Sequence, residues 1–133
     1  MKIKSKDDMK VGVVVWFLPD GKMTPPKAQL DKYAIARRHP FVCTYYDSAS
    51  GVSQWLFLTS DEHRADKDCV FKVADKGGTL PEWLEKDSYF VRNNCAEIAK
   101  VEDVISLSAD DSFAMPALVK EEVLNKFGVV VLK

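Results

Sequence analysis

Two strand-like runs joined by a short turn constrain the fold of this chain more than any other feature of its sequence. Phe41–Tyr46 and Ser53–Leu58 are rich in aromatic and aliphatic residues, and the segment between them contains Ser and Gly. This pattern is typical of a β-hairpin. An antiparallel pair brings the start of its first strand beside the end of its second. We therefore expect the residues before Phe41 and after Leu58 to meet.

The residues that flank these two strands carry groups suited to phosphate. They are Arg37, Arg38 and His39 before the first strand, and Thr59 and Ser60 after the second. Arginine offers a permanent cationic fork, histidine exchanges a proton near neutral pH, and hydroxyls donate hydrogen bonds. The sequence therefore predicts a phosphate-binding site at this end of the hairpin.

Each of these residues also has an ordinary structural interpretation. The two arginines can form a solvated patch after a loop, and the histidine can be an extended surface residue before a proline. The hydroxyls can do no more than cap a turn. A second histidine, His63, stands among charged residues and is expected to face solvent.

The rest of the chain predicts a mainly β protein. Val11–Leu18 is apolar almost throughout, which favours a strand covered on both faces. Asn93-Asn94 predicts a tight turn or a bulge between two later strands. Ala117–Phe127 has amphipathic spacing and is bounded by Pro116 and Gly128, which predicts a helix. The further expected strands are Cys69–Ala74, Ser88–Arg92, Ala96–Lys100 and Val129–Leu132.

These elements predict one domain spanning residues 1–133, of the α+β class, with an antiparallel barrel or strongly bent sheet and a C-terminal helix. Lys2–Lys10 is polar and is expected to be a loose arm. Lys22–Ala36 contains Pro25-Pro26 and is expected to be a long surface loop. That loop is open to two interpretations, a functional loop or an ordinary insertion.

Composition limits the classes of function. A net charge of −1 excludes a strongly basic protein that coats nucleic acid, although it leaves room for a local basic patch. No apolar run approaches the roughly 20 residues that a membrane helix needs, so we expect a cytoplasmic protein with no membrane partner. Cys43, Cys69 and Cys95 lack metal-ligand spacing and are expected to be buried thiols.

The aromatic residues allow two interpretations. Trp16, Trp55 and Trp83 are able to stack on unpaired bases, but each stands in or beside an apolar run, which favours core packing. Tyr45 and Tyr46 are adjacent in a strand and must point to opposite faces. We expect one to be buried and the other to be accessible.

Several short motifs, taken in order, resemble the MazF/PemK group of small toxin ribonucleases. In that group the first strand opens with Gly and carries an aromatic residue four positions later, as Gly12 and Trp16 do here. An Arg-Pro dipeptide then leads into an apolar strand, and His39-Pro40-Phe41-Val42 occupies that place. The next strand ends in Thr-Ser or Thr-Thr, as Leu58-Thr59-Ser60 does. A polar insert comparable to Asp87-Ser88-Tyr89 and a C-terminal helix complete the order.

The resemblance covers most of the chain and implies an SH3-like antiparallel barrel. It implies a toxin endoribonuclease that cleaves single-stranded RNA through attack of the 2′-hydroxyl, with no metal and no cofactor. It further implies a homodimer held in check by an antitoxin protein. The residues it assigns are Arg38, His39 and Thr59 to catalysis, and Arg37 and Ser60 to RNA binding.

One position departs from the group. The group places its catalytic arginine directly before the proline, whereas this chain has His39 there and Arg38 one position earlier. A one-residue offset in a strand points a side chain to the opposite face. Three alternatives are open: the start of the strand is bulged, His39 has taken over the role of the catalytic arginine, or the site is altered or inactive.

Two other functions compete with RNA cleavage. The histidine at the arginine position is consistent with a non-catalytic SH3-like barrel that binds a protein or peptide. A gyrase-poisoning relative of the same barrel is the third possibility. Such relatives act through C-terminal residues that include a Trp, and Phe127–Lys133 contains none.

Overall fold

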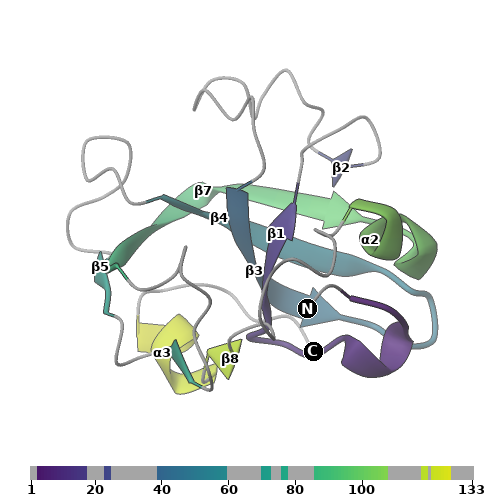
Figure 1. Ribbon diagram of the computed structural model, residues 1–133, viewed down its shortest axis with the longest axis horizontal. Coiled ribbons are helices and arrows are strands. Elements are labelled where there is room, and N and C mark those ends of the chain that lie inside the picture. Colours follow the sequence, from purple (N-terminus) through teal and green to yellow (C-terminus); the bar gives the residue numbers. More distant parts are fainter. Residues whose placement is uncertain are drawn as a thin grey trace.

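The computed structural model describes residues 3–17, 23–24, 39–59, 70–72, 76–77, 86–107, 118–119 and 121–126. Antiparallel strands dominate these residues, with three short helices beside them, so the mainly β, α+β class is confirmed (Figure 1). The helices are η1 (Lys6–Asp8), α2 (Val101–Leu107) and α3 (Glu121–Lys126). The strands are β1 (Val14–Phe17), β2 (Met23–Thr24), β3 (His39–Tyr46), β4 (Ser53–Thr59), β5 (Val70–Phe71), β6 (Lys76–Gly77), β7 (Ser88–Ile98) and β8 (Leu118–Val119).

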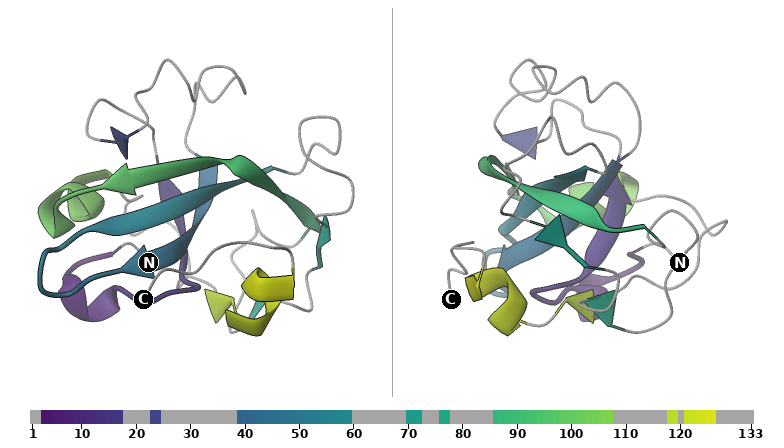
Figure 2. Two further views of the ribbon diagram at one scale, coloured as in Figure 1. Left: turned by 180° about the vertical axis from the view of Figure 1, so that it is seen from behind. Right: turned by 90° about the vertical axis from the view of Figure 1, so that its left-hand side faces the viewer.

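The main sheet has the order β1-β3-β4-β7-β2, and β5 also pairs with β7. The predicted hairpin is confirmed, because β3 and β4 pair with Phe41 opposite Phe57. β7 is the longest strand, and Figure 2 shows it lying along β4 and bending before it reaches β5. β6 and β8 form a separate two-stranded sheet.

Two irregularities bend the main sheet. Thr44 is one extra residue in β3, because Cys43 pairs with Trp55 but Tyr45 pairs with Gln54. In β7 three residues are extra, because Leu56 pairs with Cys95 while Leu58 pairs with Phe90. Of the two alternatives for Asn93-Asn94, the structure shows the bulge and not the turn: Ser88–Arg92 and Ala96–Ile98 lie in the single strand β7. The second predicted strand, Ala96–Lys100, ends two residues earlier than expected. Such bulges increase local twist and bend the strand that carries them.

The core lies on one face of the hairpin and includes residues of the N-terminal segment and of α2. Phe41 and Phe57 are fully buried, with ring centroids 5.8 Å apart at 56°. Val13 and Val15 belong to the same cluster. The opposite face is also covered, since Val14, Val42 and Leu56, which lie outside this cluster, are buried. β1 is thus covered on both faces, as its apolar run predicted. The remaining members of the main cluster are Ile3, Met9, Cys43, Trp55, Ile98, Val104 and Leu107.

The N-terminal segment is a packed part of this core, so its prediction as a loose arm is wrong. Ile3 and Met9 are buried on either side of η1. Ser5 and Asp8 form a capping box: the Ser5 Oγ accepts from the Asp7 N–H, and the Asp8 carboxylate accepts from the Ser5 N–H at 3.3 Å. The capping residues Ser5 and Asp8 are visible in the sequence. The segment was nevertheless predicted as a loose arm because it is mostly polar, and its two apolar anchors, Ile3 and Met9, were overlooked.

The C-terminal helix is shorter than predicted. Within the expected Ala117–Phe127, Leu118–Val119 form β8, and α3 begins at Glu121. Strand pairing overrides the helical pattern there, because β8 pairs with β6 and the Val119 N–H donates to the Gly12 carbonyl at 2.7 Å. α2 was not predicted.

Several predicted segments lie outside the described residues. They include Val129–Leu132 and the Lys22–Ala36 loop apart from Met23–Thr24, which pair with β7. Of the predicted strand Cys69–Ala74, Val70–Phe71 are strand β5.

Candidate functional site

The predicted site falls at one end of the β3–β4 hairpin. His39 is the first residue of β3 and Thr59 the last of β4, and each lies two positions outside the Phe41–Phe57 pair. Neighbouring strands also reach this end, since His39 pairs with Phe17 of β1 and Thr59 pairs with Tyr89 of β7. We call this end, defined by His39, Thr59 and Tyr89, the hairpin base.

Three of the five predicted site residues lie outside the described residues: Arg37, Arg38 and Ser60. His63 lies there too. For His39 and Thr59 the structure gives the backbone position, and it brings their two strand ends to the same end of the hairpin. The catalytic assignment of Arg38, His39 and Thr59 remains a prediction.

Tyr89 is a residue of the hairpin base that the sequence analysis did not assign to the site. Its side chain is half-buried, and its backbone pairs with both Thr59 and Val70. The adjacent Ser88 is buried, which fixes the start of the strand. A half-exposed tyrosine at a strand start has the flat face that stacks on a base. The signal was an aromatic residue directly after the polar Asp87-Ser88.

A lysine stands next to the hairpin base. The Lys72 Nζ lies 3.2 Å from the Asp87 carboxylate, and their side chains are 63% and 44% exposed. An ion pair this exposed contributes little to stability. Lys72 directly follows β5, whose Phe71 pairs with Ser88, so it lies beside the start of β7.

Comparisons with protein-family models, curated proteins and solved structures find no match for this chain. The functional case comes from the residues and their placement. Across the residues that the structure describes, no helix combines the length and apolar character needed to cross a membrane. The same residues hold no group of three or more His, Cys, Asp or Glu side chains arranged for a metal ion.

The tryptophans that the structure describes pack into the protein. Trp55 is fully buried, and its Nε1 donates to the Ser53 Oγ at 2.8 Å, which in turn donates to the Ile98 carbonyl. Core packing is confirmed for Trp55, while Trp16 is half-buried and Trp83 lies outside the described residues. Cys43 is confirmed as a buried thiol, and it donates to the Tyr45 carbonyl. Cys69 and the side chain of Cys95 lie outside the described part.

Proposed function

We propose that this protein is a metal-independent endoribonuclease of the MazF/PemK type, a toxin that cleaves single-stranded RNA. The observation that carries the proposal is the placement of the matching motifs. Gly12 precedes β1, Pro40 is the second residue of β3, and Thr59 ends β4, on three successive strands of one antiparallel sheet. Gly12 has a φ of 95°, a backbone conformation that favours glycine.

The proposed catalytic group is built on two strand ends, His39 at the start of β3 and Thr59 at the end of β4. His39 and Thr59 are two positions from Phe41 and Phe57, which share one core cluster. The hairpin therefore brings the backbones of His39 and Thr59 to one end of the sheet, and the proposal builds on that placement. The proposal assigns Arg38, His39 and Thr59 to catalysis, and Arg37 and Ser60 to binding of the RNA backbone.

The proposed reaction needs a base, an acid and donors to the phosphate. A base removes the proton of the 2′-hydroxyl, the 2′-oxygen attacks phosphorus, and the 5′-oxygen leaves with a proton supplied by an acid. The products are a 2′,3′-cyclic phosphate and a 5′-hydroxyl. His39 exchanges these protons near neutral pH, and the Thr59 hydroxyl donates to a phosphoryl oxygen as charge develops. Tyr89 offers an adjacent stacking surface.

The SH3-like barrel belongs to the same proposal. Its support is the strongly bulged β7 and the hydrogen bond from Val119 to Gly12, which joins β8 to the chain just before β1. The proposed partners are single-stranded RNA, an antitoxin protein and a second copy of the chain in a homodimer. The proposed location is the cytoplasm.

The test uses purified protein and a library of short, 5′-labelled single-stranded RNAs in EDTA. We expect cleavage by the wild type, with 2′,3′-cyclic phosphate ends identified by mass spectrometry. His39→Ala and Thr59→Ala should each lower the rate by about 100-fold or more. Lys10→Ala, an exposed lysine of the N-terminal segment, is the control and should cleave normally. The proposal is refuted if the wild type leaves the RNA intact, or if both site variants cleave it as fast as the wild type does.

A non-catalytic barrel that binds a protein or peptide is the second candidate. The observation that favours it is His39 at the position where the MazF/PemK group has its arginine. Two results together would distinguish this candidate: the wild-type protein leaves RNA intact, and a stable protein partner is recovered with it. RNA cleavage that disappears in Arg38→Ala or His39→Ala excludes it.

A further inference from the structure

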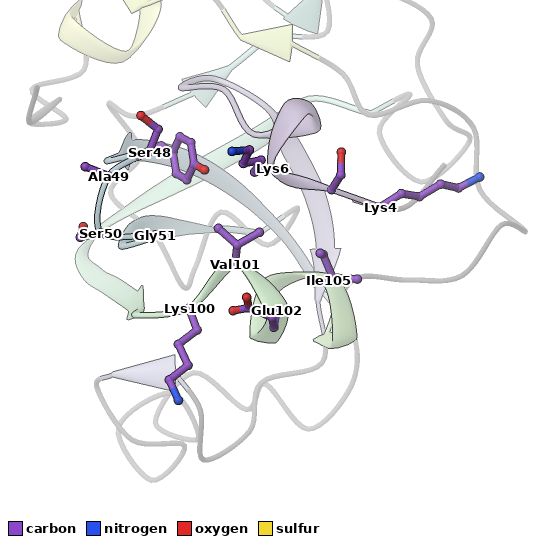
Figure 3. Close-up of a pocket in the computed structure, with 12 residues that line it drawn as sticks. Lys4, Lys6, Ser48, Ala49, Ser50, Gly51, Lys100, Val101, Glu102 and Ile105 are labelled. Atoms are coloured by element: carbon purple, nitrogen blue, oxygen red, sulfur yellow. The ribbon is translucent and has the colours of Figure 1, made fainter.

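The opposite end of the same hairpin borders a hollow of about 460 Å³ (Figure 3). Three segments far apart in sequence form it: Lys4–Lys6 around η1, the Ser48–Gly51 turn, and Lys100–Glu102 at the start of α2. Tyr46 and Ile105 complete the lining. None of these residues belongs to the hairpin base, so the hollow is a separate candidate site.

The charges of the lining favour an anion. Lys4, Lys6 and Lys100 line the hollow and are exposed, against one carboxylate, Glu102. Figure 3 shows the Lys6 amino group directed toward the turn at Ser48, while Lys4 and Lys100 extend outward on different sides. Lysine is a compact charge on a flexible four-carbon stem, so Lys100 is able to swing over a bound anion.

The turn that forms one wall is held by its own hydrogen bonds. The Asp47 carboxylate accepts from the Ser50 Oγ at 2.7 Å and from the Ala49 N–H at 3.1 Å. The Ser50 hydroxyl, more than the Ala49 N–H, lowers the pKa of Asp47 below its ordinary value. The Asp47 carboxylate therefore forms its hydrogen bonds within the turn, whereas the exposed Ser48 lines the hollow.

Tyr46 brings an unused hydrogen-bonding group to this site. The bulge at Thr44 reverses the alternation of β3, so that Tyr46 packs against the core cluster that also holds Cys43. Its hydroxyl oxygen is buried and has no hydrogen-bond partner among the described residues. A buried hydroxyl without a partner is costly, and a ligand oxygen is one way to satisfy it. The hydroxyl is covered, so a side chain over the hollow must move for a ligand to reach it.

We propose that this hollow binds a phosphate-bearing small molecule. Lys6 and Lys100 supply the charge, Ser48 and Tyr46 supply hydroxyl hydrogen bonds, and Val101 and Ile105 form the apolar wall for the organic part. Lysine binds phosphate as a point charge, whereas planar carboxylate recognition more often uses arginine. The proposal is independent of RNA cleavage and is measured without RNA.

The experiment titrates the full chain with inorganic phosphate and, separately, with adenosine 5′-monophosphate, followed by calorimetry and amide chemical shifts. We expect saturable binding with a Kd of about 1 mM or tighter and shifts confined to the lining segments. Phosphate should compete with the nucleotide. Absence of saturation in both titrations, or nucleotide binding that phosphate does not displace, overturns the proposal.

Charge and hydroxyl variants distinguish this site from adventitious ion binding. Lys6→Gln should weaken binding several-fold and Glu102→Gln should tighten it, while the control Lys10→Gln, which does not line the hollow, should leave it unchanged. Tyr46→Phe should weaken binding about tenfold, and the neighbouring Tyr45→Phe should not. Equal affinities for Lys6→Gln and Lys10→Gln would show an adventitious ion only and refute the site.

Discussion

Two separate features of the structure require a glycine at position 12. Its φ of 95° disfavours any residue with a Cβ, and a Cβ at this position would come within about 2.0 Å of the Val119 carbonyl oxygen. That oxygen is backbone, which cannot rotate away as a side chain can. Gly12 is thus a point of close approach between β8 and the chain before β1.

Gly12→Ala should lower the free energy of unfolding by about 3 kcal/mol or more, because left-handed strain adds to the displacement of β8. Urea unfolding measures the change. Gly51→Ala is the matched control: its φ is 78°, but its Cβ would lie 3.6 Å from the nearest atoms of Val101, an ordinary contact. We expect it to cost about 1 kcal/mol. Equal losses in the two variants would contradict this account.

Ser50→Ala should raise the pKa of Asp47 toward its ordinary value, because the Ser50 hydroxyl is the main group that lowers it. The folded pKa lies below the unfolded value of about 3.9, so the stabilisation is present above that pH and is lost as pH falls through the folded pKa. NMR titration of the Asp47 carboxyl measures the shift. Ser106→Ala, whose hydroxyl donates to the Asp103 carbonyl, is the control and should leave the Asp47 pKa unchanged.

The N-terminal segment shows how an element can be anchored by few residues. Ile3 and Met9 enter the main cluster on either side of η1, while Lys4, Lys6 and Asp7 between them are exposed. The polar residues between these two anchors carry the capping hydrogen bonds. Fixing the segment to the sheet also builds one side of the lysine-lined hollow.

Ile3→Ala should lower the free energy of unfolding by about 2–5 kcal/mol, because it empties a fully buried position. Lys4→Ala, the exposed neighbour, should change it by no more than about 0.5 kcal/mol. Chemical denaturation of the two variants checks the difference. If Ile3→Ala were as stable as Lys4→Ala, the segment would not be part of the core.

Sequence patterns predicted elements where a local signal and tertiary pairing agree. The hairpin followed from its apolar runs and turn, and β1 from its β-branched run. The sequence predicted two strands in place of β7 because Asn93-Asn94 is compatible with a turn and with a bulge. Pairing with β4 decides between these two structures. β8 was assigned to a helix because its partners, Lys76–Gly77 and Gly12, are distant in sequence.

The candidate site was predictable from the sequence only where it depends on local hairpin geometry. The pairing of two strand ends followed from hairpin geometry, which places His39 and Thr59 at one end. The position of Tyr89 opposite Thr59 depends on a long-range register, which no local pattern encodes. The hollow was not foreseen either, because it is assembled from three segments that only the fold brings together.

At the scale of the whole molecule, one core cluster joins the N-terminal segment, the main sheet and α2. Ile3, Trp55 and Val104 belong to it, although each comes from a different part of the chain. The contact between Gly12 and Val119 adds β8 to the same body. Such sharing of one core favours all-or-none unfolding.

Tryptophan fluorescence and far-UV circular dichroism should therefore report the same denaturation midpoint. Trp55 reports on the core cluster, whereas the dichroism averages over all strands and helices. Two separated transitions would show that the sheet and its neighbours are independent folding units. Trp55→Phe, which keeps an aromatic ring but removes the indole, identifies the Trp55 contribution to the fluorescence change.

The link between Gly12 and Val119 has a consequence during synthesis. Roughly a hundred residues separate the two, and ribosomes add about 5–20 residues per second. Val119, whose N–H donates to the Gly12 carbonyl, is therefore synthesised several seconds after Gly12, while the growing chain is still attached to the ribosome. During that interval the segment before β1 lacks its contact with β8, so this part of the fold is completed only late in synthesis.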